Sequence, residues 1–299
     1  MRNLTPAEED KVRNLVRRSP AFIGMRVAVH NEHVAVLAPE ELEVGLGPVF
    51  NAVADAPPAE WPTLVDECLT WILRALTDGS PELDGPTEAL LSRVYARLRP
   101  IAGSPTQWWT YAREVAPGLL MVLALDHPHH ISILTDEQVS RHGHDRLLEA
   151  GLDNLCTQLP DTFAMSDEVY IVSGGDYVAS AALVLPWVIE SATGVDGIND
   201  MDNGALVAMP DHNTLIFHPI TTASRLHHAL TETATLTAER HNEAENPLSA
   251  YVHWWQPGTG YLEAVAHAAP DDSTIGADVV TSYPPAFMDL LTNLAAEQH

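Results

Sequence analysis

Short segments with strand-like patterns occur in pairs along much of the chain, with turn-forming residues between the members of each pair. Most of them alternate hydrophobic and polar residues, and residues 118–126 form a continuous apolar run. These pairs lie within residues 21–38, 118–134, 204–218 and 250–266. A period of two predicts half-buried strands, and short turns between such strands predict antiparallel hairpins. We therefore expect a largely antiparallel sheet built from hairpins.

Other segments show helical spacing of their apolar residues. Thr5-Pro6-Ala7-Glu8 has the composition of a capping box with proline in the first turn, which predicts a helix that runs to Arg18. Further helices are predicted over 41–54, 61–78, 87–98, 135–159, 177–193 (bent at Pro186), 222–243 and 285–296. Hairpins with helices between them indicate an α+β fold with the helices packed on the sheet.

The best candidate for a linker is the stretch TDGSPELDGPTE at residues 77–88, which is rich in proline, glycine and aspartate. It predicts an N-terminal domain of residues 1–80, with a helix, a hairpin and a helix pair, and a larger α+β domain of residues 81–299. A single continuous domain is the alternative.

The charge is strongly unbalanced, with 41 acidic and 15 basic residues and a formal net charge of −26. Such a surface repels phosphate backbones and anionic lipids, so we expect neither nucleic acid nor a membrane as partner, whereas a basic protein suits it. The longest apolar run, residues 117–125, is too short to span a bilayer, and the N-terminus lacks the apolar region of a signal peptide. These features predict a cytoplasmic protein.

Three stretches of the chain are similar to the YtpQ-like family of bacterial cytosolic proteins. They are Leu119–Pro160, with Ala150-Gly151-Leu152-Asp153-Asn154-Leu155 near its end, then Gly175-Asp176-Tyr177-Val178-Ala179-Ser180, and then Val207–Ile216. The resemblance covers most of the chain except about the last 30 residues. It implies an α+β fold and a bacterial cytosolic location. It implies no mechanism, because the family has no assigned activity.

Asp126, His127, His129 and His130 lie together in the stretch LALDHPHHISIL. Imidazole and carboxylate groups are suitable ligands for zinc, and His127 and His129 would share one face of a strand. A third ligand would have to come from elsewhere, with His142 and His144 as the first candidates and His212 or His218 as others. The alternative, which we favour, is an exposed polar turn at the tip of a hairpin.

Two tryptophan pairs, Trp108-Trp109 and Trp254-Trp255, offer a different kind of site. Adjacent residues of a strand point to opposite faces, so one ring of each pair is expected at the surface. Exposed tryptophan on an acidic surface is typical of a protein-binding face. The alternative is that both rings of each pair are buried.

The loop Gly174-Gly175-Asp176-Tyr177 follows a predicted strand, but it has neither the glycine spacing nor the lysine of a phosphate-binding motif. Since no complete catalytic motif is present, we expect a non-enzymatic protein without a cofactor that binds a basic protein partner, for example as an immunity or inhibitor protein. Two other hypotheses remain open. One is a metal-dependent hydrolase around His127 and His129. The other is a small-ligand sensor with a pocket lined by the Gly174–Ser180 loop, which includes the candidate binding residues Asp176 and Tyr177.

Overall fold

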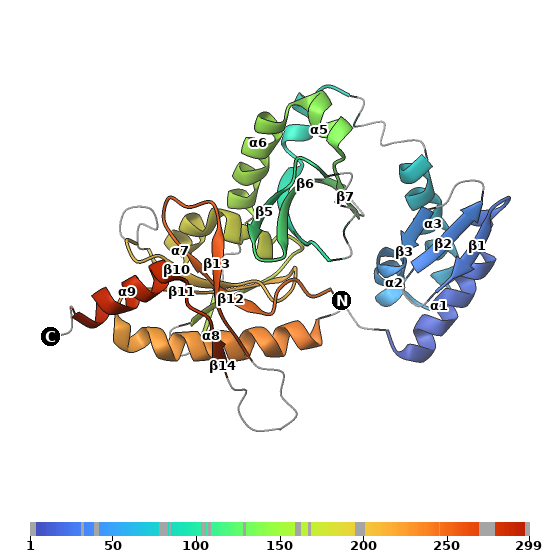
Figure 1. Ribbon diagram of the computed structural model, residues 1–299. Coiled ribbons are helices and arrows are strands. Elements are labelled where there is room, and N and C mark those ends of the chain that lie inside the picture. The colour runs from blue at the N-terminus through green and yellow to red at the C-terminus, as the bar shows by residue number, and fades with distance from the viewer. Residues whose placement is uncertain are drawn as a thin grey trace. The chain divides into compact units, whose positions relative to one another are not determined.

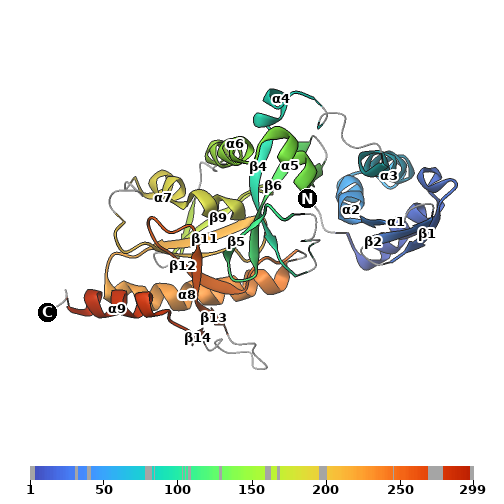
Figure 2. The ribbon, with the colours of Figure 1, turned by 45° about the horizontal axis from the view of Figure 1, so that its top comes forward.

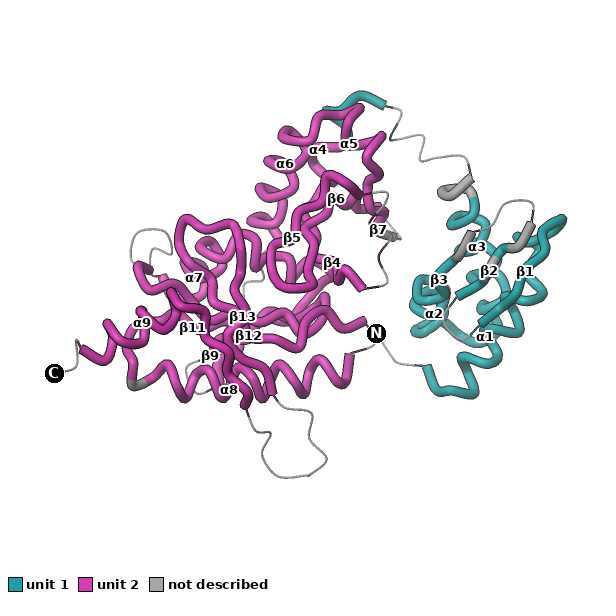
Figure 3. The backbone as a smooth tube through the Cα atoms, viewed as in Figure 1, with its two compact units in different colours: residues 1–89, 128–130 teal, residues 90–127, 131–299 magenta. Residues whose placement is uncertain are grey.

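The chain divides into two compact units, residues 1–89 with 128–130 and residues 90–127 with 131–299 (Figure 3). The computed structural model describes residues 4–30, 33–38, 42–77, 83, 85–102, 104, 106, 109–127, 130–158, 163–166, 169–194, 201–244, 246–268 and 279–296. The predicted domain boundary after residue 80 falls outside these described residues.

The first unit is a three-stranded antiparallel sheet, in the order β1-β2-β3, with helices packed on it (Figure 1). Its elements are α1 (Pro6–Arg18), the short 3₁₀ helix η1 (Pro20–Phe22), β1 (Arg26–Val29), β2 (His33–Ala38), β3 (Leu42–Gly45), α2 (Gly47–Ala54) and α3 (Trp61–Thr77). Thr5 and Glu8 form the expected capping box at the start of α1. Apolar side chains from all three longer helices and the sheet, including the fully buried Val16, Val49 and Leu69, make one core.

The helix predicted over residues 41–54 is wrong in its first part. Leu42–Gly45 forms β3, in which Val44 pairs with Val34 of β2 and is buried. Sheet pairing and burial of Val44 outweigh the helical spacing in the sequence, and the helix begins only at Gly47, where Pro48 fits the first turn.

The second unit contains a small sheet in the order β4-β6-β5, with β7 also paired to β6. The elements of this part are α4 (Glu88–Leu91, at the division between the units), β4 (Val94–Pro100), β5 (Arg113–Ala116), β6 (Leu119–His127), β7 (His130–Ile133), α5 (Asp136–His142) and α6 (His144–Thr157). The helix predicted over 87–98 is correct in its first part, where α4 forms, and wrong from residue 94 onward, because residues 94–100 pair along their whole length with β6. Apolar Val94, Ala96 and Leu98 alternate with larger polar residues there, and this period of two matches a strand.

A seven-stranded antiparallel sheet, in the order β14-β13-β12-β10-β11-β9-β8, forms the rest of the second unit (Figure 1). Its elements are β8 (Ala164–Ser166), β9 (Val169–Ser173), the 3₁₀ helix η4 (Ala179–Val184), α7 (Leu185–Thr193), β10 (Ala205–Ala208), β11 (Thr214–Pro219), α8 (Ala223–Glu243), β12 (Tyr251–Trp255), β13 (Leu262–Ala268), β14 (Val279–Thr281) and α9 (Pro285–Ala296). The predicted hairpins β10–β11 and β12–β13 are confirmed.

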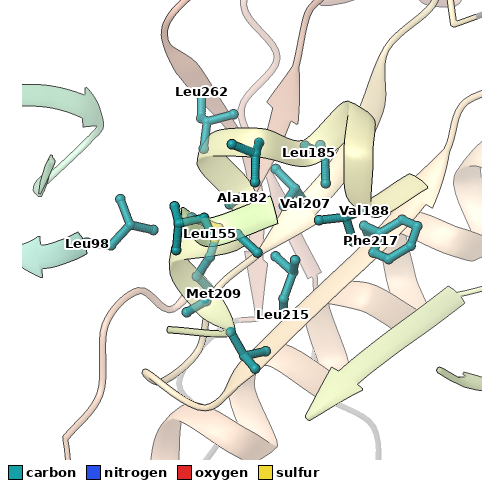
Figure 4. Packing of buried hydrophobic residues seen from close by; sticks show 14 of the residues in the cluster. Leu98, Leu155, Ala182, Leu185, Val188, Val207, Met209, Leu215, Phe217 and Leu262 are labelled. Carbon is teal, nitrogen blue, oxygen red and sulfur yellow. The ribbon is translucent and has the colours of Figure 1, made fainter. Parts of the chain in front are cut away.

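Helices cover both faces of the seven-stranded sheet (Figure 2). Leu206, Ile216 and Trp254 point from one face toward α8 and α9. Val207, Leu215 and Phe217 point from the other face toward η4, α7 and α6 (Figure 4). Together with the first unit, this arrangement confirms an α+β fold with helices packed on antiparallel sheets.

The continuous helix predicted over 177–193 is wrong in detail. Residues 179–184 form η4, and α7 starts at Leu185 with Pro186 in its first turn. Proline lacks the N–H that an interior position would donate, whereas a first-turn position needs none. The chain therefore changes helix type just before Pro186 and begins a new helix there.

Candidate functional site

The histidine-rich stretch that suggested a metal site is a hairpin between β6 and β7. His127 at the end of β6 and Ser132 in β7 are hydrogen-bonded through Nε2 and Oγ at 3.0 Å. His129 lies outside the described residues. The His127 side chain therefore contacts its own hairpin. In the exposed turn that the sequence favoured, this side chain would point to solvent.

The two other histidines proposed as ligands lie at the junction of α5 and α6. His142 is buried at the end of α5, and His144 Nδ1 is hydrogen-bonded to the adjacent Asp145 Oδ1 at 3.0 Å. Across the described residues, no three His, Cys, Asp or Glu side chains lie close enough together to hold a metal ion. The described residues therefore provide no set of metal ligands for the hydrolase hypothesis.

The three described tryptophans of these pairs do not form the expected exposed face. Trp109 and Trp254 are buried, and Trp255 is half-buried against the core on the other face of the sheet. Trp254 donates from Nε1 to Asn203 O at 3.0 Å, so its polar atom is used internally. Trp108 lies outside the described residues. The prediction of a binding face is wrong for Trp109 and Trp254, because both rings fill hydrophobic clusters.

The loop after β9 brings Tyr177 into a compact aromatic and polar cluster. Tyr177 is buried, and its ring stacks on Tyr95 of β4 with the ring centroids 4.3 Å apart. Its hydroxyl donates to Asp126 Oδ1 at 3.5 Å, and Arg97 Cζ lies 5.2 Å from its ring centroid. Asp176 is exposed beside it. Asp126 and Tyr177, which the sequence linked to different hypotheses, are thus neighbours.

The functional residues that the sequence analysis missed are the arginines of β4. Tyr95, Arg97 and Arg99 alternate along this strand and share one face, and Arg93 directly precedes the strand. A helix over 87–98 would place Arg93 and Arg97 on one side and Tyr95 on another, and it would end before Arg99. That prediction hides the face that Tyr95, Arg97 and Arg99 share. The signal that could have revealed them is the alternation of Val94, Ala96 and Leu98 between them.

Burial dominates the electrostatics of this cluster. It lowers the pKa of the Arg97 guanidinium, and Tyr177 and the carboxylates of Asp176 and Asp126 only partly offset this. It also raises the pKa of Asp126. His212, in the turn between β10 and β11, has a pKa lowered to about 3 by burial and by Arg97 and Arg99. His212 is therefore neutral at pH 7.

A second feature lies in the first unit, on the surface of α3. Asp66, Glu67, Thr70 and Trp71 line a shallow hollow of about 300 Å³. Glu67 lies one turn before Trp71 on α3, so the helix places the Glu67 carboxylate near the indole ring. Asp66 lies one turn before Thr70 and lines the same hollow. Carboxylates attract a cation, and an aromatic face adds a cation–π interaction. The hollow therefore has the chemistry to receive a lysine or arginine side chain.

Comparison with known proteins adds no identity to these sites. Within the described residues, no helix combines the length and the apolar character needed to cross a bilayer. No protein-family model, no curated protein and no solved structure matches this chain.

Proposed function

We propose that this chain is a non-enzymatic, acidic binding protein that recognises a basic protein partner through the hollow on α3. An immunity or inhibitor protein of the bacterial cytoplasm that neutralises a basic partner is the most concrete form of this proposal. The observation that supports it is the combination of Asp66, Glu67 and Trp71 around one hollow.

Charge explains how such a partner would be attracted. The net charge of −26 draws a basic protein toward the chain over distances of about the Debye length, which is about 30 Å at 0.01 M salt and about 8 Å at 0.15 M. The hollow then supplies a local contact for one cationic side chain, worth about 0.5–2 kcal/mol from the indole ring alone. Association is therefore fast at low salt and weakens as the salt concentration rises.

The test measures binding of a labelled arginine-rich peptide to the full-length chain, with a peptide of the same length in which every arginine is glutamine as the comparison. We expect the arginine peptide to bind more tightly, and more weakly at about 0.15 M than at about 0.01 M salt. Trp71→Ala and the double variant Asp66→Asn/Glu67→Gln should each weaken binding by about tenfold, which corresponds to about 1.4 kcal/mol.

The matched control is Glu149→Gln/Asp153→Asn, which removes two exposed carboxylates one turn apart on α6. This variant has the same net charge as Asp66→Asn/Glu67→Gln but an intact hollow, so its affinity should stay close to that of the wild type. Equal losses in the two double variants would mean that overall charge, and not the hollow, binds the peptide. Equal binding of both peptides would reject a basic partner.

A further inference from the structure

Positive charge is concentrated at one place in the second unit. Residues 90–299 contain only eight basic residues, and two of them, Arg97 and Arg99, lie on the same face of β4. Arg97 is 7% exposed, although charged side chains are rarely this buried without a partner of opposite charge. A buried guanidinium group at Arg97 and a partly buried one at Arg99, side by side in an acidic protein, are the feature that needs an explanation.

Two hydrogen bonds bring the turn between β10 and β11 close to this face. The backbone N–H of Leu98, between Arg97 and Arg99, donates to Ser180 Oγ at 3.0 Å. The N–H of the preceding residue, Ala179, donates to His212 O at 3.2 Å. His212 is thus tied through η4 to the same part of β4, and its imidazole lies within electrostatic reach of both arginines.

Three nitrogen atoms of this cluster are buried without a hydrogen-bond partner among the described residues: Arg97 Nη1, Arg99 Nε and His212 Nδ1. The large majority of buried side-chain polar atoms in native proteins are paired, since leaving one unpaired costs about 1–3 kcal/mol. Both arginine atoms can only donate, and neutral His212 donates from Nδ1 in one of its two tautomers. All three atoms are suited to the same partner, a group that accepts hydrogen bonds.

Arg97 and Arg99 differ in the negative charge that surrounds them. Arg97 has Asp126 and Asp176 nearby, and both favour its charged form. For Arg99, burial and the positive charge of Arg97 lower the pKa of the guanidinium, and none of the described carboxylates counters them. A buried guanidinium without a counter-charge is costly, so a negative charge beside Arg99 would stabilise the site.

We propose that Arg97, Arg99 and His212 form a binding site for an oxyanion, the carboxylate or phosphate group of a small-molecule ligand. Arginine suits both groups because its planar guanidinium can donate two parallel hydrogen bonds to them. The stacked Tyr95 and Tyr177 rings provide an apolar wall beside the site. This site is distinct from the hollow on α3, and its ligand has the opposite charge, so either proposal can fail without the other.

The test titrates the full-length chain with inorganic phosphate and, separately, with succinate, while sodium chloride keeps the ionic strength constant. Calorimetry gives the affinity, and the arginine Nε–Hε signals in ¹⁵N-resolved NMR report which guanidinium groups respond. We expect saturable binding of at least one of the two anions, with shifts of the Arg97 and Arg99 signals. The tighter of the two anions identifies the chemical group that the site prefers.

Arg99→Gln should weaken that binding at least about tenfold, since it removes the charge and the donor that have no carboxylate beside them. The matched control is Arg113→Gln on β5, because Arg113 is exposed and its Nη2 donates weakly to Gly260 O at 3.5 Å. This control should bind like the wild type and should retain the Arg97 and Arg99 shifts.

Arg99→Lys serves as a second variant that keeps the charge, in case Arg99→Gln does not fold as judged by circular dichroism. It should bind more weakly than the wild type, because an ammonium group cannot make the two parallel hydrogen bonds. Wild-type affinity in Arg99→Lys, or equal losses in Arg99→Gln and Arg113→Gln, would overturn the proposal. Absence of saturable binding for both anions would overturn it as well and would leave the cluster a purely structural feature.

Discussion

At the scale of single residues, the second unit holds a histidine whose ring is completely buried. His253 of β12 lies opposite Val207 of β10 and has no exposed surface. Burial lowers its pKa from 6.5 to about 4, and the backbone of Val207 acts weakly in the opposite direction. The imidazole is therefore neutral throughout the physiological range and must stay neutral for the strand to remain packed.

This buried histidine predicts that the protein loses stability in mild acid. Between pH 6.5 and pH 4 the unfolded chain binds a proton at His253 and the folded chain does not, so the free energy of unfolding falls as the pH falls. From pH 7.5 to pH 5 the loss from this residue amounts to about 2 kcal/mol. His253→Leu should reduce the total loss over this interval by about that amount, as measured by urea unfolding at both pH values.

The control for this prediction is His227→Leu, which replaces an exposed histidine on α8. It should leave the difference in stability between pH 7.5 and pH 5 close to that of the wild type. Equal pH dependence in His253→Leu and the wild type would contradict the assignment and would leave other groups, such as His212 with its pKa of about 3, as the source.

At the scale of elements, α6 lies unusually close to β4 because Gly151 has no side chain. A Cβ atom at Gly151 would lie 2.8 Å from Ala96 N and 3.1 Å from the carbonyl carbon of Tyr95. One turn later, Asn154 Nδ2 donates to Leu91 O and Val94 O, both at 2.7 Å. The helix therefore packs on the backbone of β4, the strand that carries the arginine cluster.

Gly151→Ala is expected to destabilise the protein although alanine favours helices. The gain in helix propensity is about 1 kcal/mol, whereas overpacking against a backbone that cannot move freely costs about 1–3 kcal/mol. Because the cost of overpacking exceeds the gain in helix propensity, Gly151→Ala should unfold at a lower thermal midpoint than the wild type. Gly175→Ala is the control, because a Cβ atom there meets no other atom within 4 Å. A higher midpoint for Gly151→Ala than for the wild type would show that α6 can shift away from β4.

The same strand shows how far the sequence predicts the fold and the site. Local sequence patterns predict the structure correctly where they fit only one type of element. The capping box of Thr5 and Glu8 and the hairpin around Pro210 are examples. Residues 87–98 have both a helical and an alternating pattern, and only pairing with β6 decides between them. The alternation of Val94, Ala96 and Leu98 could have shown that Arg97 and Arg99 share a face. The approach of His212 to them could not be predicted, because it depends on the contact of β4 with η4.

At the scale of the whole molecule, the two units have separate hydrophobic cores. The core of residues 1–89 includes Val12, Val16 and Leu69, all fully buried, and the described residues of that core come only from this unit. A domain that buries its own core can fold alone. The division also separates the two proposed sites, with the hollow on α3 in one unit and the arginine cluster in the other.

A fragment of residues 1–89 is therefore expected to fold without the rest of the chain. Its circular dichroism should show helix and strand and a cooperative thermal transition, since its sheet and helices close over one core. Leu69→Ala should cost about 2–5 kcal/mol of stability in this fragment, because Leu69 is fully buried. Ile23→Ser is the control, because Ile23 is 81% exposed and its loss should leave the transition nearly unchanged. An unfolded fragment, or equal effects of the two substitutions, would mean that the first unit depends on contacts with the remainder of the chain.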